Sequence, residues 1–543
     1  MENESTSTRA RLGGAGMGEK VAQWVDRRLG TRHLKGTVMS RVFPDHWSFL
    51  LAQICLYSFL VLLVTGIYLS FYFHPSSAPM VYQGSYAPLR GQLVSEAFNS
   101  TMHISFDVRG GLLIRQAHHW AALIFVAAML THVMRVFFTG AYRMPREISW
   151  VIGLLLLVLG MFGGLTGYDL PDDLLSGTGL AVVNGTLLSI PVVGTYLSMF
   201  LFGGSFPGDD VIGRFNTIHV VLIPAVMVTL IVVQIVLFRR QGNAQFPGPG
   251  RTNRNVVGLP FRVYAAKSGG YFFLVTGMIF TIASIAQINP IWRYGPYRAD
   301  QVSAGSQPDW YMGVADGLLR VMPGWEINAW GHTLALDNLI PLMASAGLFL
   351  ALGVYPFIES WATGDDREHH LLDRPRNRPV RTGFGAAWLT AYGVALIGAA
   401  NDLIATQLHV SVNAVTWAVR VGLVAAPPIA YVVAKRWALG LQRRDRDMVL
   451  HGRETGVIRR LPHGEFVEVH QPLARADLYT LTAHQQYAPL TAAPVAAGHG
   501  ADPRPTASAR LRAGLSRVLY GPGTQIPKPT ADEDRQITGP HRP

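Results

Sequence analysis

Charged residues and cysteine are both scarce in this sequence. Asp, Glu, Lys and Arg make up 15% of its 543 residues, whereas a soluble domain usually carries about 25%. The single cysteine, Cys55, excludes an internal disulfide and an iron–sulphur cluster held by this chain alone. No C-x-x-C-H motif occurs, which excludes covalently attached c-type haem. Apolar residues make up 49%, so the chain is neither disordered nor collagen-like.

Long apolar runs account for the low charge. Each is close to the roughly 20 residues that a helix needs to cross a bilayer. The eight runs are residues 48–73, 113–138, 150–167, 216–238, 270–288, 334–358, 384–400 and 413–434. A further run, 180–203, is interrupted by Asn, Gly and Pro, and we expect it to form a pair of short surface helices. The sequence therefore predicts an all-α polytopic membrane protein with eight transmembrane helices.

Basic residues outnumber acidic ones, 46 against 34, for a net charge of +12. Most of the arginines in loops follow the second, fourth and sixth predicted spans, whereas the intervening loops carry few. By the positive-inside rule, the arginine-rich loops and both termini are expected to be cytoplasmic. Because the basic residues follow the membrane boundaries and do not form one helix face, we expect no nucleic-acid partner.

Five segments follow from the spans and the charges. Residues 1–45 form a polar cytoplasmic segment without the apolar core that a signal peptide needs. Residues 46–240 hold the first four spans, 241–268 form a cytoplasmic loop, and 269–435 hold the other four spans. Residues 436–543 form a cytoplasmic tail, whose last forty residues have the Pro-, Ala- and charge-rich composition of disordered chain.

Four histidines, His118, His119, His132 and His219, lie inside predicted spans, where ionisable residues are costly and usually functional. His119 lies about 140° from His132 around the helix, so only His118 shares a face with His132. His118 and His132 are fourteen residues apart, so they lie about 40° apart around the helix and about 21 Å apart along it. His219 lies in the fourth span at the same predicted depth as His118. Paired imidazoles on facing helices can hold a haem iron, so His118 and His219 are candidate haem ligands. The alternative is that each histidine bonds a carbonyl or lines a polar pathway.

His132 has no evident partner in the fourth span. The residue at the matching depth, fifteen positions after His219, is Gln234, and an amide is a poor ligand for haem iron compared with imidazole. Arg115 and Arg135 each lie one turn from a candidate ligand and could neutralise haem propionates. Their alternative role is to extend towards the lipid headgroups.

The chain resembles cytochrome b, the membrane subunit of quinol–cytochrome c reductase (bc1) complexes, and in particular the long actinobacterial form. The resemblance covers roughly residues 40–470. Its motifs are the His118/His132 spacing, RFNTIHVVLIP at 214–224, GYDLP at 167–171, QPDWYMG at 307–313 in place of the family's PEWY signature, QFPGPGRTNRNVVG at 245–258 and ESWATGDDREHHLLDRPRN at 359–377.

The resemblance implies two b haems in a four-helix bundle formed by residues 46–240. His118 and His219 would bind the outer haem iron, and His132 would bind the inner one. The family also places glycines against the porphyrins, which Gly66, Gly153 and Gly167 match, whereas the remaining position is Ala52. Ala52 and Gln234 both fall at the inner haem. We therefore expect a diverged copy whose inner haem is lost, five-coordinate or weakly held, unless Gln234 or another histidine serves as ligand.

The resemblance also implies quinol oxidation at the outer face of a bacterial plasma membrane, and its actinobacterial form implies menaquinol as the substrate. The pocket would combine residues 168–171 with Pro308, Asp309, Trp310 and Tyr311. Asp309 stands where the family has Glu and can accept a quinol proton, although it could instead cap a helix. Implied partners are a Rieske iron–sulphur subunit, a cytochrome c subunit, a terminal oxidase and a second copy of the complex.

Two other functions stay open from the residues alone. A diverged cytochrome b could keep the scaffold in an assembly or regulatory role, as Gln234 and Ala52 suggest. A polytopic transporter could use its histidines and aspartates for proton transfer, but it should show internal repeats and helices broken near the midplane. The sequence shows neither of these features.

Overall fold

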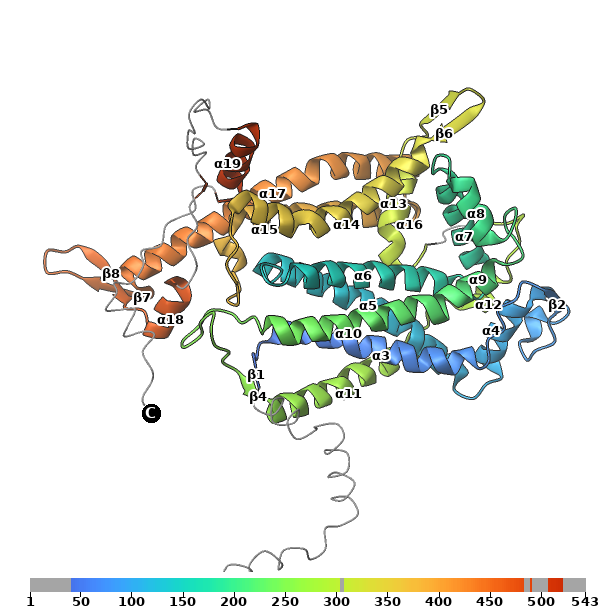
Figure 1. Ribbon diagram of the computed structural model, residues 1–543, viewed down its shortest axis with the longest axis horizontal. Coiled ribbons are helices and arrows are strands. Elements are labelled where there is room, and N and C mark those ends of the chain that lie inside the picture. The colour runs from blue at the N-terminus through green and yellow to red at the C-terminus, as the bar shows by residue number, and fades with distance from the viewer. Residues whose placement is uncertain (1–40, 303–306, 483–488, 491–505, 521–543) are drawn as a thin grey trace, which may run out of the picture.

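The computed structural model describes residues 41–302, 307–482, 489–490 and 506–520. Residues 1–40 of the predicted N-terminal segment and residues 483–488, 491–505 and 521–543 of the predicted tail lie outside the described residues. Long helices dominate the fold (Figure 1). They are α3 (Leu50–Ser70), α5 (Gly111–Thr139), α6 (Glu147–Tyr168), α10 (Ile223–Gln241), α11 (Phe261–Ile285), α14 (Leu336–Thr363), α15 (Pro379–Gly398) and α17 (Val412–His451).

In the described part of the chain, seven helical stretches are long and apolar enough to cross a membrane. One of them joins α9 (Val211–Thr217), the π-helical η3 (Ile218–Leu222) and α10 into a single stretch. An eighth candidate is the pair α15 and α16 (Asn401–Leu408), which bends by 67°. These helices lie where the hydropathy pattern predicts them, so the predicted all-α polytopic fold is confirmed.

The long helices form two layers (Figure 1). One layer contains α3, α5, α6, α10 and α11, and the other contains α14, α15 and α17. α11 packs against α3 and α5, so the fifth predicted span joins the first four. Across the layers α6 contacts α14 and α5 contacts α15. Buried Trp150, Leu157 and Trp388 belong to the apolar core of the bundle.

Glycines set the two ends of α5, the helix that carries His118 and His132. Gly110 precedes α5 with a φ of 72°, and Gly140 follows it with a φ of 61°. Residues with a Cβ rarely adopt this left-handed conformation, which reverses the chain at helix ends. The two glycines therefore fix which residues of α5 lie at each end of the bundle.

At the end of the bundle nearer His118, which we call the site end, short elements cover the long helices (Figure 1). α7 (Leu174–Leu188) and α8 (Gly194–Phe202) lie here, which confirms that the run 180–203 forms a pair of short helices. Asp173 begins α7 with a capping box to Ser176. The other elements are α4 (Glu96–Phe106), α12 (Ile291–Tyr294), η4 (Trp310–Met312), α13 (Gly313–Val321) and the paired strands β2 (Pro79–Val81) with β3 (Leu93–Ser95) and β5 (Glu326–Ala329) with β6 (His332–Ala335).

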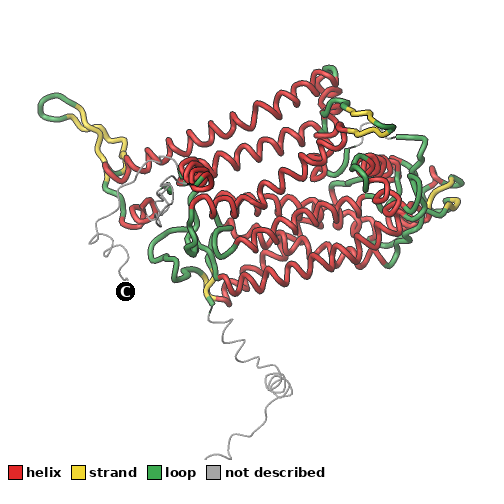
Figure 2. Tube along the Cα trace, turned by 45° about the horizontal axis from the view of Figure 1, so that its top comes forward, coloured by secondary structure: helices red, strands yellow, loops and turns green. Residues whose placement is uncertain are grey.

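The opposite end, which we call the loop end, contains the connections 140–146, 242–258 and 364–378. Strands β1 (Val42–Phe43) and β4 (Leu259–Pro260) pair here. α17 continues beyond the bundle and leads into the projecting hairpin of β7 (Arg453–Arg460) and β8 (Phe466–Gln471) (Figure 2). The short helix α18 (Arg475–Thr482) follows the hairpin.

The last forty residues differ in part from the expectation of disorder. Ala507–Leu519 form helix α19, which Thr506 begins by accepting a hydrogen bond from the backbone of Ala509. α19 packs against α14, and Arg512 Nε donates to the carbonyl of Trp361 at 2.6 Å. The buried residues Ala513 and Ser516 form a packing face on α19. The overall composition of the last forty residues does not reveal this face.

Candidate cofactor site

His118 on α5 and His219 on η3 face each other at the site end. Their ring centroids are 6.1 Å apart and their planes cross at 72°. Imidazole nitrogens bind metal ions at about 2 Å, so two rings that share one ion have centroids about 6 Å apart. The predicted pairing of His118 with His219 therefore has the spacing that a single iron requires.

Hydrogen bonds fix the tautomer of both rings. His219 Nδ1 donates to the carbonyl of Gly163 at 2.8 Å. His118 Nδ1 lies 2.9 Å from Thr65 Oγ1, and it donates to this oxygen because the hydroxyl itself donates to the carbonyl of Val61 at 2.6 Å. A metal-binding histidine typically donates one ring N–H in this way and keeps its other nitrogen for the metal. Nε2 of both histidines is therefore free to bind iron.

The π-helical turn η3 places His219. Pro224 follows the turn and has no N–H, so it cannot donate to the carbonyl of Val220 as an α-helix requires. Single π-turns of this kind often occur at functional sites.

Two predicted glycines lie directly against these imidazoles. A Cβ on Gly66 would lie 3.2 Å from His118 Cε1, and one on Gly167 would collide with the ring of His219. A side chain at Gly167 would therefore displace the histidine. The third predicted glycine, Gly153, differs because a Cβ there would meet no atom within 4 Å.

A cavity of about 260 Å³ opens beside the histidine pair. His118, His219, Arg115, Gly66 and Gly167 line it, so it collects five of the predicted cofactor residues. Arg115 donates through Nη2 to the carbonyl of Asn289 at 3.0 Å, while its buried Nη1 has no partner in the described part of the chain. That unpartnered donor suits an anionic group such as a propionate. The site-end residues thus fit a haem with two imidazole ligands.

The predicted quinol residues divide into two groups. Asp309 and Tyr311 line the cavity, whereas Pro308 and Trp310 are not among its lining residues. Trp310 is half-buried and packs against the core of the bundle. The side chain of Asp309 makes no cap bond to η4, although its carbonyl accepts from Met312. The capping alternative for its carboxylate is therefore wrong.

Asp309 is held by two donors, one of which the sequence reasoning missed. His119 Nε2 lies 3.0 Å from Oδ1 and 2.9 Å from Oδ2 of Asp309. Tyr311 donates its hydroxyl to Oδ2 at 2.8 Å. The side chains of His119 and Asp309 are 17% and 9% exposed, and both line the cavity. The sequence signals for His119 were its position next to His118 and its place, as an ionisable residue, inside a predicted span.

Further carboxyl groups are buried beside this cavity. Burial raises the pKa of Asp172 and of Asp173 to about 6. Burial and the neighbouring carboxylates raise the pKa of Asp169 well above its usual range, and neither of its carboxyl oxygens has a partner within the described residues. The site end therefore concentrates acidic groups that gain or lose protons more readily near neutral pH than ordinary aspartates do.

The surroundings of His132, near the loop end, are different. His132 Nδ1 and Gln234 Oε1 are both buried without a hydrogen-bond partner among the described residues. No second histidine has a ring contact with His132 in this part of the chain. Arg135 donates to Ser48 at 3.3 Å and stacks over Phe49, while its Nη2 is unpartnered. These residues fit one imidazole ligand but not two.

Ala52, the other departure at the predicted inner haem, is exposed on α3. It presents a methyl group where the resemblance leads us to expect glycine. Gln234 leaves His132 as the one strong haem ligand that the sequence places at this depth. Ala52 affects only the space beside a porphyrin, because its Cβ occupies room that a glycine would leave.

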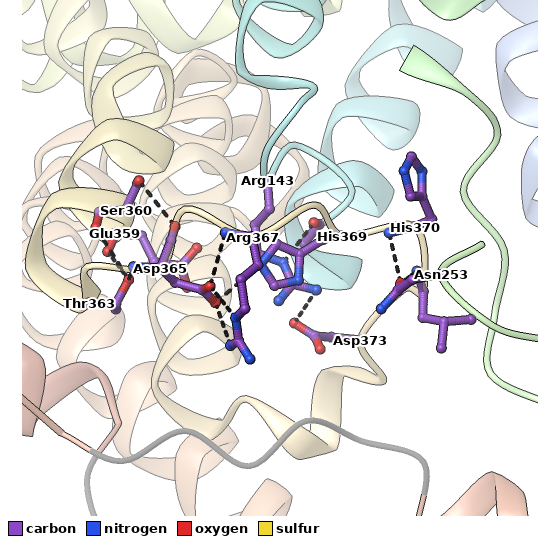
Figure 3. A network of polar contacts seen from close by, with 12 residues as sticks. Arg143, Asn253, Glu359, Ser360, Thr363, Asp365, Arg367, His369, His370 and Asp373 are labelled. Atoms are coloured by element: carbon purple, nitrogen blue, oxygen red, sulfur yellow. Dashed lines mark hydrogen bonds and ion pairs between the residues drawn. The ribbon is translucent and has the colours of Figure 1, made fainter.

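An ion-pair network joins the connections at the loop end (Figure 3). Asp373 pairs with Arg143 at 3.0 Å, Arg378 at 3.2 Å and Arg381 at 2.8 Å. Arg381 also pairs with Glu359 of α14 at 2.7 Å. Arginines hold the pKa of Asp373 well below its usual range. The motif at 359–377 therefore forms a structural clamp between the two layers.

The connection 242–258 is held against the connection 364–378 by hydrogen bonds to the backbone. Asn253 Oδ1 accepts from the backbone N–H groups of His370 and Leu371 at 3.0 and 2.8 Å (Figure 3). Arg146 donates to the carbonyl of His369 at 2.7 Å. Burial and the charge of Arg143 lower the pKa of His369 to about 4.

Comparisons with known proteins bear on the family and the fold of this chain. A family model described as "Cytochrome b(N-terminal)/b6/petB" matches residues 123–296. The "Cytochrome bc1 complex cytochrome b subunit" of Streptomyces coelicolor is 58% identical over 99% of this chain and 98% of its own length. The protein of the same name from Mycobacterium tuberculosis H37Rv is 49% identical over 84% of each chain.

A solved structure shares the fold. A chain of "Hyperthermophilic respiratory Complex III" superposes with a TM-score of 0.56 at 22% identity. The match covers 77% of this chain and all of the other.

Proposed function

This chain belongs to the cytochrome b subunits of bc1 complexes, and on that premise we propose that it oxidises quinol at the site end. The observation that carries the proposal is a single cavity lined by the His118/His219 pair and by the carboxylate of Asp309. This cavity brings a pair of proposed haem ligands next to a proposed proton acceptor. Membership of this family contradicts the transporter alternative.

His118 and His219 would hold the haem iron through Nε2, and Arg115 would face a propionate. When bound, haem b supplies one-electron oxidation and reduction. Thr65 and Gly163 keep both imidazoles in the tautomer that can bind iron. Gly167 leaves room for the ring of His219.

Asp309 would accept a proton from a quinol hydroxyl in the cavity. Its carboxylate is 9% exposed and lies on the cavity wall. General-base groups act on protons within hydrogen-bond reach, directly or through one water. Menaquinol is the quinol that we propose, because the resemblance is to the actinobacterial form.

The complex would supply the remaining redox groups. The single Cys55 cannot hold an iron–sulphur cluster, so we assign that role to a Rieske partner and the c-type haem to a cytochrome c subunit. A terminal oxidase and a second copy of the complex complete the proposed partners. The site end would face outward and the arginine-rich loop end inward, so that protons released from quinol leave on the outer side.

A second candidate function rests on Gln234. Within the described residues His132 Nδ1 has no hydrogen-bond partner, and the matching position of α10 is Gln234 and not an imidazole. A diverged copy with the inner haem lost or weakly held would serve in assembly or regulation. The two candidates differ in whether the chain turns over quinol at all.

The substitution Asp309→Asn tests the proposed function. It keeps the shape of the side chain and removes the proton acceptor, so turnover of the isolated complex with a reduced menaquinone analogue should fall about 100-fold or more. The readout is quinol-dependent reduction of cytochrome c. Asp300→Asn, which changes an exposed carboxylate paired with Arg298, is the matched control and should leave turnover unchanged. Unaltered turnover in Asp309→Asn would contradict the role of Asp309.

A further inference from the structure

We propose that His119 is a positioning residue for quinol oxidation, whose Nε2–H holds the carboxylate of Asp309 in place at the cavity wall. The inference rests on the proposed function and deepens it. Neither the sequence motifs nor the names of the relatives assign a role to this histidine.

Adjacent residues on one helix face two different groups here. Successive side chains on an α-helix point about 100° apart. His118 therefore faces His219, while His119 faces the segment that leads into η4. The same turn of α5 therefore carries the proposed iron ligand, His118, and positions the proposed proton acceptor, Asp309, through His119.

The contact joins parts of the chain that are 190 residues apart. Asp309 lies in a connection and not on a long helix, so its own backbone does not fix it to the bundle. His119 Nε2 reaches both carboxyl oxygens, at 3.0 and 2.9 Å, and Tyr311 donates to Oδ2. These bonds restrict the rotation of the carboxylate about its side-chain torsions.

The short side chain of Asp309 gives this restraint its importance. An aspartate reaches one methylene less far than a glutamate, so a small rotation moves its oxygens out of reach of a quinol hydroxyl. Because a misplacement of about 1 Å can reduce a rate about 100-fold, a fixed donor has a large effect on turnover. The positioning role requires an N–H donor at the Nε2 position of His119. It does not require the ring to change its charge.

A purely structural role for His119 makes a different prediction. A buried hydrogen bond that only stabilises the fold would change haem content and thermal stability together with activity. A positioning role changes kcat, with KM for quinol and the haem spectrum preserved. The two roles are therefore separable by kinetics and spectroscopy.

Two amide substitutions give the sharpest test. His119→Gln places an N–H close to the position of Nε2, whereas His119→Asn places it near that of Nδ1, too short to reach Asp309. Both are uncharged amides, and their helix propensities differ by only about 0.5 kcal/mol, so we expect both variants to fold. We expect His119→Gln to keep most of the kcat and His119→Asn to lose about 10- to 100-fold, the range for a lost hydrogen bond to a charged group.

The assay uses the whole complex with menadiol as donor and cytochrome c as acceptor, and the reduced-minus-oxidised spectrum is recorded for each variant. His103→Gln, which alters an exposed histidine paired with Asp107, is the control and should match the unaltered chain. Equal activity of His119→Gln and His119→Asn, whether both full or both lost, would overturn the positioning role. Absence of turnover in the unaltered complex would instead contradict the proposed function itself.

Discussion

The two ends of α5 carry the same kind of residue in very different surroundings. His118 donates from Nδ1, and its ring centroid lies 6.1 Å from that of a second imidazole. His132, by contrast, has a buried Nδ1 without a partner among the described residues, and the residue that matches it in depth is Gln234. The comparison shows that a histidine inside a membrane helix is not by itself a metal ligand. A fixed tautomer and an opposed second ligand distinguish the site that fits haem from the one that fits it only in part.

Polar interactions are also distributed differently between the two ends. At the site end, Asp169 and Arg115 keep buried polar atoms that have no partner in the part of the chain that the structure describes, which leaves them available to a bound group. At the loop end, Arg381 pairs with both Glu359 and Asp373, and Asp373 also pairs with Arg143, which follows α5 and so joins the two layers. Because His132, Gln234 and Arg135 also keep unpartnered buried atoms among the described residues, the ion pairs of Asp373 and Arg381 are what distinguish the loop end.

The largest expected effect comes from removing one ligand at the site end. His219→Leu should abolish binding of the haem there and with it quinol turnover, because no other imidazole faces His118 in the described part of the chain. Acid-acetone extraction followed by haem quantification measures the loss. His132→Leu is the paired variant and should leave the site-end haem and its spectrum in place. If both variants lose the same haem signal, the distinction between the two histidines is wrong.

A smaller effect is expected from a glycine of α6. Gly167→Ala would push a methyl group into the ring of His219. Overpacking costs about 1–3 kcal/mol, so haem retention during dilution should weaken roughly 10- to 100-fold. Gly277→Ala on α11 is the matched control, because its new methyl would meet no atom of the described residues within 4 Å and the resemblance places no haem against it. Equal haem retention in the two variants would contradict the tight packing at Gly167.

The smallest effect concerns the pH dependence of the loop end. The folded pKa of His369 is about 4, below the unfolded value of 6.5. The unfolded chain therefore takes up a proton first as the pH falls, and folding stability declines from about pH 6.5 towards pH 4. This group accounts for a loss of about 2 kcal/mol by pH 5.

His369→Gln removes this proton uptake and should flatten the decline. The measurement is the thermal midpoint of the complex at pH 7 and pH 5 for both chains. His103→Gln, at an exposed position, should keep the original slope. An unchanged pH dependence in His369→Gln would show that other groups govern stability at this end.

Much of the fold could be predicted, because a membrane-spanning helix is recognised from the local composition of its own residues. The pairing of His118 with His219 followed from helical periodicity and from depth along two spans. The contact of His119 with Asp309 did not, since it depends on the path of a connection 190 residues away. Neither did the inward turn of Trp310 towards the core, because the direction of side chains in η4 depends on tertiary packing. Helix α19 was missed because its buried face is formed by the small residues Ala513 and Ser516.

The most direct test of the central claim counts and types the b haems of the isolated complex. Acid-acetone extraction gives haem b per chain, and electron paramagnetic resonance separates bis-imidazole low-spin iron from other forms. We expect one bis-imidazole haem per unaltered chain, held by His118 and His219, and a second such signal in Gln234→His. Two bis-imidazole haems in the unaltered chain would contradict the claim that its two haem positions differ.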